Sequence, residues 1–139
     1  MTAGFVADSS VGVAWVVPSQ ASEASNRLRD DIESGTPFVV PGLWFFEVAN
    51  TLLVLTRRGR IDDKECALAL RHLSHLGAMV DEEGSRLAFG KISELAEKHA
   101  LSVYDAVYLE LSMRKGLPLA SRDGALNKAA KASGIKTLV

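Results

Sequence analysis

Short apolar runs alternate along this chain with longer segments in which apolar residues recur at helical spacing. This alternation is typical of a parallel α/β sheet, because each strand is followed by a helix that returns the chain to the start of the next strand. We predict helices at residues 9–17, 21–34, 43–58, 62–75, 85–99, 102–115 and 123–134. The predicted strands, at residues 4–7, 37–40, 78–80, 117–120 and 135–139, would form a central parallel sheet of four to five strands.

Length and composition fit one folded domain. The chain has 139 residues, of which 47% are hydrophobic and 24% charged, so we predict a single domain spanning residues 1–139. The net charge of −1 does not by itself indicate nucleic-acid binding, which usually requires a basic surface. No charged leader precedes the first strand, and no apolar run approaches the ~20 residues needed to cross a bilayer. We therefore expect a cytoplasmic protein without a membrane segment.

Three acidic residues fall where a strand ends or a helix begins. Asp8 follows the first predicted strand, Asp123 follows the fourth, and Asp105 lies in the first turn of the helix before the fourth strand. The carboxyl ends of parallel strands share one edge, where ligands bind in such folds, and topology alone places all three acids there. Each acid also has a simpler interpretation, since Asp residues are common helix caps and Ser102 with Asp105 has capping-box spacing.

Glu47 lies inside a helix that is apolar on most sides. With Asn50 and Thr51 it forms one polar stripe, because residues three and four apart share a helix face. This stripe is either the wetted face of a buried helix or one side of a cleft shared with Asp8. Crowded carboxylates repel one another, and a hard cation such as Mg²⁺ or Mn²⁺ relieves that repulsion and can polarise a phosphodiester. The four acids therefore favour metal-dependent phosphodiester hydrolysis.

The four acids lie in four short motifs: VADSS at residues 6–10, EVAN at 47–50, LSVYDA at 101–106 and LASRD at 119–123. In this order the motifs resemble those of the PIN-domain ribonucleases, and among them the VapC-type toxins of toxin–antitoxin modules. The resemblance covers nearly the whole chain. Ser121 stands where the family has a hydroxyl residue, and Arg122 places a cation beside the fourth acid.

The resemblance implies a three-layer α/β/α domain and an endoribonuclease that depends on Mg²⁺ or Mn²⁺. It further implies a homodimer, a cognate VapB-type antitoxin that blocks the site, and products with a 5′-phosphate and a 3′-hydroxyl. On this hypothesis the catalytic and metal-binding residues would be Asp8, Glu47, Asp105 and Asp123. The residues that orient those ligands or the attacking water would be Ser10, Asn50 and Ser121.

Two alternatives remain at this point. The first is a catalytically inactive PIN-like module that binds RNA or protein, although a scaffold has no reason to tolerate four clustered acids. The second is a phosphate-handling enzyme of the receiver or haloacid-dehalogenase type. Those proteins need a pair of acids around the first strand, and Asp8-Ser9-Ser10 supplies only one.

Overall fold

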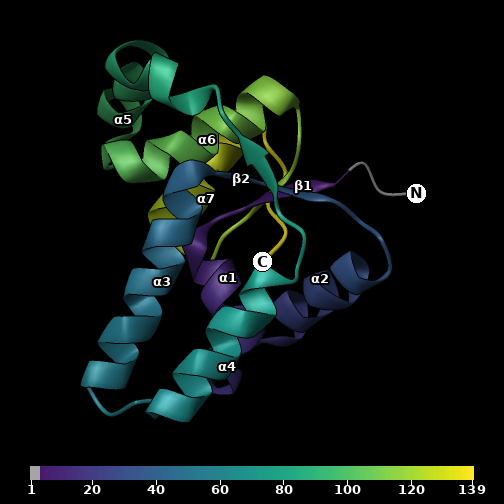
Figure 1. Cartoon of the computed structure of the whole chain (residues 1–139). Helices are drawn as coiled ribbons and strands as arrows, with labels where there is room; N and C mark the ends of the chain where they lie inside the picture. The colour runs from purple at the N-terminus through teal and green to yellow at the C-terminus, as the bar shows by residue number, and fades with distance from the viewer. Residues whose placement is uncertain (1–3) are drawn as a thin grey trace.

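A four-stranded parallel sheet lies at the centre of the computed structural model, which describes residues 4–139 (Figure 1). The strand order is β3-β2-β1-β4, and each neighbouring pair is parallel. In register, Val6 of β1 lies between Val39 of β2 and Leu119 of β4. The strands are β1 (Phe5–Ala7), β2 (Phe38–Pro41), β3 (Met79–Asp81) and β4 (Leu119–Ala120).

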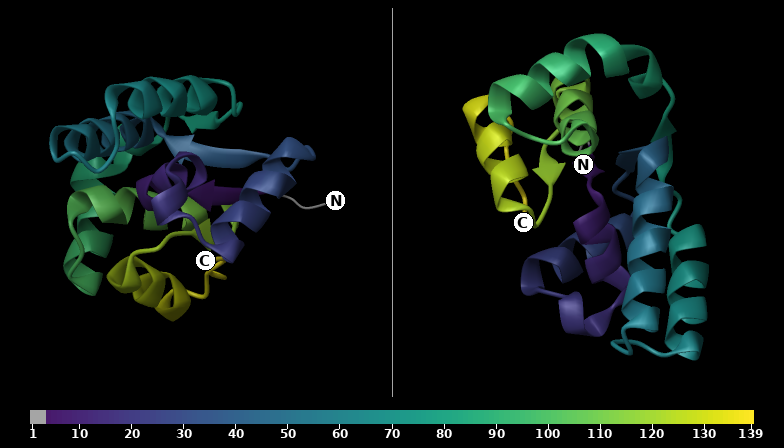
Figure 2. Two further views of the ribbon diagram at one scale, coloured as in Figure 1. Left: turned by 90° about the horizontal axis from the view of Figure 1, so that it is seen from below. Right: turned by 90° about the vertical axis from the view of Figure 1, so that its left-hand side faces the viewer.

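Helices cover both faces of the sheet, which makes the predicted three-layer architecture correct. With the usual right-handed crossovers, the helices between β1 and β3 lie on one face of the sheet. The helices that precede and follow β4 lie on the other face. Accordingly α1 packs against α2, α3 and α4, whereas α6 packs against α5 and α7. The right-hand view of Figure 2 shows these two groups apart from each other. The helices are α1 (Ser9–Val16), α2 (Glu23–Glu33), α3 (Gly42–Arg57), α4 (Asp63–Ser74), α5 (Ser93–His99), α6 (Val103–Lys115) and α7 (Gly124–Ala132).

The core brings α1 and α3 unusually close together. Gly12 of α1 faces α3, and a Cβ atom at Gly12 would lie only 2.8 Å from Cζ2 of Trp44. Trp44 is buried, and its ring packs edge-on against Phe38 of β2. The indole Nε1 of Trp44 also donates a hydrogen bond of 3.0 Å to the backbone carbonyl of Asp8. Trp44 thus fixes the start of α3 against the carboxyl end of β1.

Two predicted elements differ from the structure. The helix predicted at residues 85–99 is divided into two short helices, η2 (Gly84–Leu87) and η3 (Ala88–Ile92), followed by α5. Gly90 has φ −123° and ψ −105°, which no helix contains, and glycine is the residue that most readily adopts such a conformation. The fifth strand, predicted at 135–139, reaches the sheet only through one parallel bridge between Leu119 and Thr137.

The α3–α4 hairpin extends away from the sheet, with the two helices side by side (Figure 1). The helix α4 begins with a capping box, in which the Asp62 carboxylate accepts from the Glu65 backbone N–H and the Glu65 carboxylate accepts from the Asp62 backbone N–H. None of the helices in residues 4–139 has the length and apolar character required to span a membrane.

Candidate active site

Asp8 lies at the carboxyl end of the central strand and is 5% exposed. Its Oδ1 atom accepts hydrogen bonds from the Ser10 hydroxyl at 2.6 Å and from the Val11 backbone N–H at 3.2 Å, so it caps α1 as the simpler interpretation predicts. Its Oδ2 atom accepts a short hydrogen bond from the Ser121 hydroxyl. Burial raises the pKa of the Asp8 carboxyl, the three hydrogen bonds partly oppose this, and repulsion from Asp105 adds to it.

The segment after β4 carries Ser121 and Asp123 and is linked to Asp8 by hydrogen bonds. The Ser121 hydroxyl, which donates to Asp8, accepts a hydrogen bond of 3.0 Å from the Asp123 backbone N–H. Asp123 in turn caps α7, because its Oδ1 atom accepts from the Leu126 N–H at 2.9 Å. Asn127 donates to the Ser121 carbonyl at 2.8 Å. Asp8 and Asp123 therefore each cap a helix and also belong to the group of four acids.

Glu47 reaches the same edge from the second turn of α3. Its Oε1 atom accepts a 2.6 Å hydrogen bond from the hydroxyl of Tyr108, a buried residue of α6. Burial raises the pKa of the Glu47 carboxyl, and repulsion from Asp105 and Asp8 raises it further, whereas the Tyr108 hydrogen bond lowers it. Sequence reasoning did not identify Tyr108. The available signal was its position three residues after Asp105, which places both on one face of α6.

Asp105 occupies the first turn of α6, where its backbone N–H donates to the Ser102 hydroxyl at 3.0 Å. Burial raises the pKa of the Asp105 carboxyl, and repulsion from Asp123 adds to the effect. Asp105 therefore interacts electrostatically with all three other acids, since it also raises the pKa of Asp8 and Glu47. The structure thus brings the four predicted acids together from four different segments.

The predicted supporting residues have different surroundings. Ser10 and Ser121 both donate to Asp8, as described above. Asn50 is exposed one turn after Glu47, and its side chain makes no hydrogen bond to any residue in 4–139. Thr51, the third member of the predicted polar stripe, donates to the backbone carbonyl of Glu47 at 3.0 Å.

The chemistry of this cluster fits a hard divalent cation. All four side chains offer carboxylate oxygens, which Mg²⁺ and Mn²⁺ prefer. Among residues 4–139, no Lys, Arg or His forms an ion pair with any of the four. In the same residues no group of three or more His, Cys, Asp or Glu side chains converges closely enough to hold a metal ion directly. The cluster is coupled through charge but is wider than a single coordination shell, so water would have to complete the coordination.

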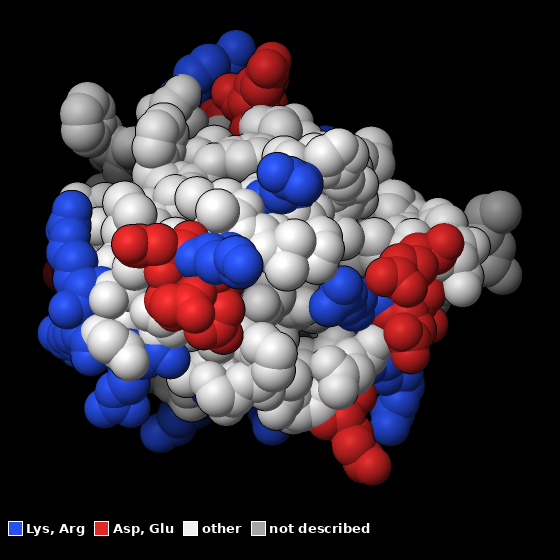
Figure 3. All heavy atoms as spheres, turned by 60° about the horizontal axis from the view of Figure 1, so that its bottom comes forward, with Lys and Arg blue, Asp and Glu red and all other residues white. Residues whose placement is uncertain are grey.

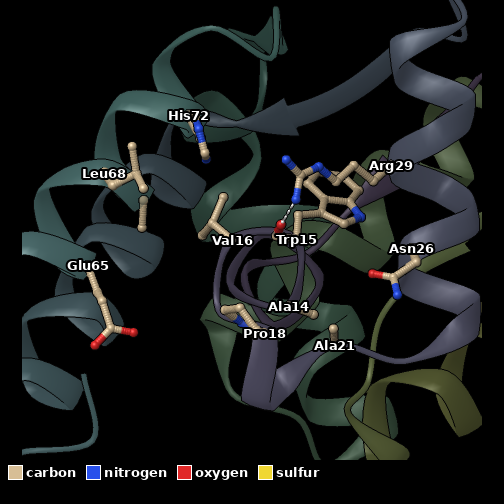
Figure 4. Close-up of a pocket in the computed structure, with 11 residues that line it drawn as sticks. Ala14, Trp15, Val16, Pro18, Ala21, Asn26, Arg29, Glu65, Leu68 and His72 are labelled. Atoms are coloured by element: carbon tan, nitrogen blue, oxygen red, sulfur yellow. Dashed lines mark hydrogen bonds between the residues drawn. The ribbon is translucent and has the colours of Figure 1, made fainter. Parts of the chain in front are cut away.

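A separate cavity of about 470 Å³ lies between α1, α2 and α4 (Figure 4). Arg29 crosses it and donates a 2.5 Å hydrogen bond to the Trp15 carbonyl, with Glu65 on the opposite side. None of the four acids lines this cavity, so it is not part of the candidate site. Its lining residues are Ala14, Trp15, Val16, Pro18, Ala21, Asn26, Arg29, Glu65, Leu68, Ala69 and His72.

Comparison with known protein families connects this site to a known fold. The profile of the family described as PIN domain matches residues 5–132. The chain belongs to the PIN domain family. This PIN domain is 29% identical over 121 residues to Ribonuclease VapC3 of Pyrobaculum aerophilum, covering 87% of this chain and 90% of that relative. The family expected from the four motifs is confirmed, and the receiver and dehalogenase alternative is excluded.

Solved structures share the fold of this PIN domain. The protein PAE2754 from Pyrobaculum aerophilum superposes with a TM-score of 0.71 at 20% identity, over 97% of this chain and 83% of that one. FitAcB from Neisseria gonorrhoeae superposes with a TM-score of 0.63 at 16% identity, over 97% and 96% of the two chains. FitAB bound to the IR36 DNA fragment superposes with a TM-score of 0.62 at 14% identity, over 96% of this chain and 92% of that one.

Proposed function

We propose that this PIN domain is a metal-dependent endoribonuclease and the toxin of a type II toxin–antitoxin module. The observation that carries the proposal is that Asp8, Glu47, Asp105 and Asp123 lie at one sheet edge, near enough to repel one another, without a cationic partner among residues 4–139. A fold gains no stability from such repulsion, so the arrangement requires a functional reason. The similarity to a protein named a ribonuclease supplies the substrate class.

In this proposal the four carboxylates bind Mg²⁺ or Mn²⁺ directly or through water. The bound ion would polarise the phosphodiester, lower the pKa of the attacking water and stabilise the leaving oxygen. Ser10 and Ser121 hold the Asp8 carboxylate in one orientation through hydrogen bonds to its two oxygens. Tyr108 does the same for Glu47. Fixed orientations matter because a ligand that must first rotate into place binds a metal ion less tightly.

We further propose a homodimer, a VapB-type antitoxin as partner, and a location in the cytoplasm. The structural similarity to FitAB, which was solved bound to a DNA fragment, and the relationship to Ribonuclease VapC3 support a two-component module. Of the three successive rings at the start of α3, Trp44 is buried, Phe45 is 43% exposed and Phe46 is 77% exposed. Large exposed aromatic side chains are enriched at protein interfaces, so we assign Phe45 and Phe46 to an interface with a partner chain.

The test of the nuclease proposal separates charge from capping. Asp8→Asn keeps a side-chain oxygen that can accept from Val11, so the cap is largely preserved while the negative charge is lost. Glu47→Gln is likewise nearly isosteric. We expect both variants to fold, to lose Mn²⁺-dependent cleavage of RNA, and to lose most of the rise in melting temperature that Mn²⁺ produces in the parent protein.

Asp62→Asn is the matched control. Asp62 also caps a helix, accepting from the Glu65 N–H at 2.7 Å, but it is exposed on α4 and perturbs none of the four acids. This variant should cleave RNA and respond to Mn²⁺ like the parent. Cleavage retained in Asp8→Asn and Glu47→Gln, or robust cleavage in EDTA, would overturn the metal-dependent mechanism. If the parent protein binds RNA without cleaving it, the non-catalytic alternative is correct.

A further inference from the structure

Arg122 is a cation with an unusual position beside the acid cluster. It directly precedes Asp123 and is exposed, and its backbone N–H donates to the Ser10 hydroxyl at 2.9 Å. Its guanidinium Nη1 donates to the backbone carbonyl of Gln20 at 2.5 Å and approaches the side-chain oxygen of Gln20 at 3.5 Å. Among residues 4–139 it forms no ion pair with a carboxylate. A carbonyl group orients a guanidinium without neutralising it, so Arg122 keeps its full charge.

Arg122 also forms part of the wall of a cavity of about 330 Å³. Ser9 and Ser10, which line the cavity, directly follow Asp8, and Thr51 lies one turn after Glu47 on α3. The cavity is therefore next to the acid cluster. We call it the Arg122 cavity, and its lining consists of Ser9, Ser10, Val13, Gln20, Thr51 and Arg122. Apart from Val13 every lining side chain is polar, and none of them is acidic.

The electrostatics of the molecule indicate what this cavity binds. Nucleic acid carries a negative charge at every phosphate, whereas this chain has a net charge of −1 and four acids at the candidate site. Figure 3 shows acidic and basic side chains interspersed on the face drawn, with neither sign covering it. The net charge of the protein therefore gives no strong overall attraction for RNA. When one phosphate of an RNA strand lies at the acid cluster, a local cation beside the next phosphate would favour binding by neutralising its charge.

We propose that the Arg122 cavity binds the backbone phosphate that adjoins the cleaved one, with Arg122 as its cationic ligand. The fork of donors on a guanidinium matches two oxygens of a phosphate, and Nη1 anchored on Gln20 holds the remaining donors in a defined direction. The side chains of Ser9 and Gln20 provide further polar contacts from the wall. This inference rests on the nuclease function proposed above, and it assigns the position of the substrate strand relative to the four acids.

The experiment compares Arg122→Gln with the parent protein on a short single-stranded RNA oligonucleotide that the parent cleaves. We expect KM to rise about tenfold with kcat nearly unchanged, because a charge-assisted phosphate contact is lost while the acids remain. The slope of log affinity against log salt concentration, measured by fluorescence anisotropy in EDTA, should fall in magnitude by about 0.7, the value for one phosphate contact on a single strand. Arg122→Lys should recover part of the loss, because it restores the charge without the fork.

A modified substrate identifies which phosphate is involved. An oligonucleotide with one neutral methylphosphonate next to the cleaved linkage should bind the parent protein less tightly. The same change should have no further effect on Arg122→Gln, since the contact is already absent. Methylphosphonates placed elsewhere in the oligonucleotide should weaken its binding to the parent protein and to Arg122→Gln equally.

Arg58→Gln is the matched control, because it removes the same charge from an exposed position. Arg58 is the residue that follows α3, and it lies eleven positions after Glu47, roughly 16 Å along the helix axis. This variant should retain the KM of the parent. If Arg122→Gln behaves like Arg58→Gln while the parent cleaves RNA, the phosphate site is wrong and the nuclease proposal stands. If the parent neither cleaves nor binds RNA, both proposals are overturned.

Discussion

The close approach of α1 to α3 leads to a quantitative prediction about Gly12. In Gly12→Ala the added Cβ would lie 2.8 Å from Cζ2 of Trp44 and 3.1 Å from Cγ2 of Val48. Neither neighbour has free space, because Trp44 is 1% and Val48 2% exposed. Overpacking of this kind costs about 1–3 kcal/mol, whereas alanine gains about 0.5–1 kcal/mol over glycine within a helix. The net loss of unfolding free energy should be about 1–2 kcal/mol.

For a chain of this size that loss lowers the melting temperature by about 3–8 °C. The assay is thermal unfolding followed by circular dichroism, with RNA cleavage measured in parallel. Cleavage should fall as well, because displacement of Trp44 stretches its hydrogen bond to the Asp8 carbonyl and moves the helix that carries Glu47.

Gly42→Ala is the control for this prediction, since a Cβ at the first residue of α3 meets nothing within 4 Å. Its melting temperature should equal or exceed that of the parent. A Gly12→Ala protein at least as stable as the parent would refute the reasoning about close packing.

Two further predictions concern the acids. Tyr108→Phe removes the hydroxyl that donates to Glu47, so the free energy of unfolding should fall by about 1–2 kcal/mol. The rise in melting temperature that Mn²⁺ produces should also become smaller. An unchanged rise would contradict an orienting role for Tyr108. The raised pKa of Asp8, Glu47 and Asp105 means that the folded state holds their protons more tightly than the unfolded chain does. These groups therefore stabilise the folded, metal-free protein fully when the pH is below their ordinary pKa values, 3.8 for Asp and 4.5 for Glu. Their contribution to the free energy of unfolding is lost as the pH rises through the higher pKa values of the folded state. In Asp8→Asn the melting temperature should depend less on pH over this window and should be higher at neutral pH, and a curve parallel to that of the parent would contradict the assignment.

The positions of the acids were predictable because each lies at a boundary that local sequence reveals. Asp8 and Asp123 follow apolar strands, and Asp105 has capping-box spacing after Ser102. Once strands are assigned as parallel, topology brings these boundaries to one edge without any knowledge of side-chain packing. Glu47 needed a different signal, namely a charge in a helix that is otherwise apolar on most sides.

The contacts that orient those acids were not predictable in the same way. The hydrogen bond between Tyr108 and Glu47 joins residues 61 positions apart, and that between Trp44 and the Asp8 carbonyl joins residues 36 apart. Neither pair follows from a helical or strand period, because the first depends on how α3 lies relative to α6 and the second on how α3 packs against the end of β1. The break at Gly90 was missed for a similar reason, since a single glycine within a helical pattern is often tolerated.

The central position of β1 has a consequence for how the protein is synthesised. β1 is translated well before one of its two neighbours, β4, which follows about 110 residues later, and Ser121 must reach Asp8 across 113 positions. Contacts this distant in sequence form late in folding, because a long stretch of chain must first be closed into a loop. The sheet edge that carries the four acids therefore cannot be completed until Asp123 has left the ribosome. If the chain is the nuclease proposed above, it therefore cannot cleave RNA while the segment between β1 and Asp123 is still being translated.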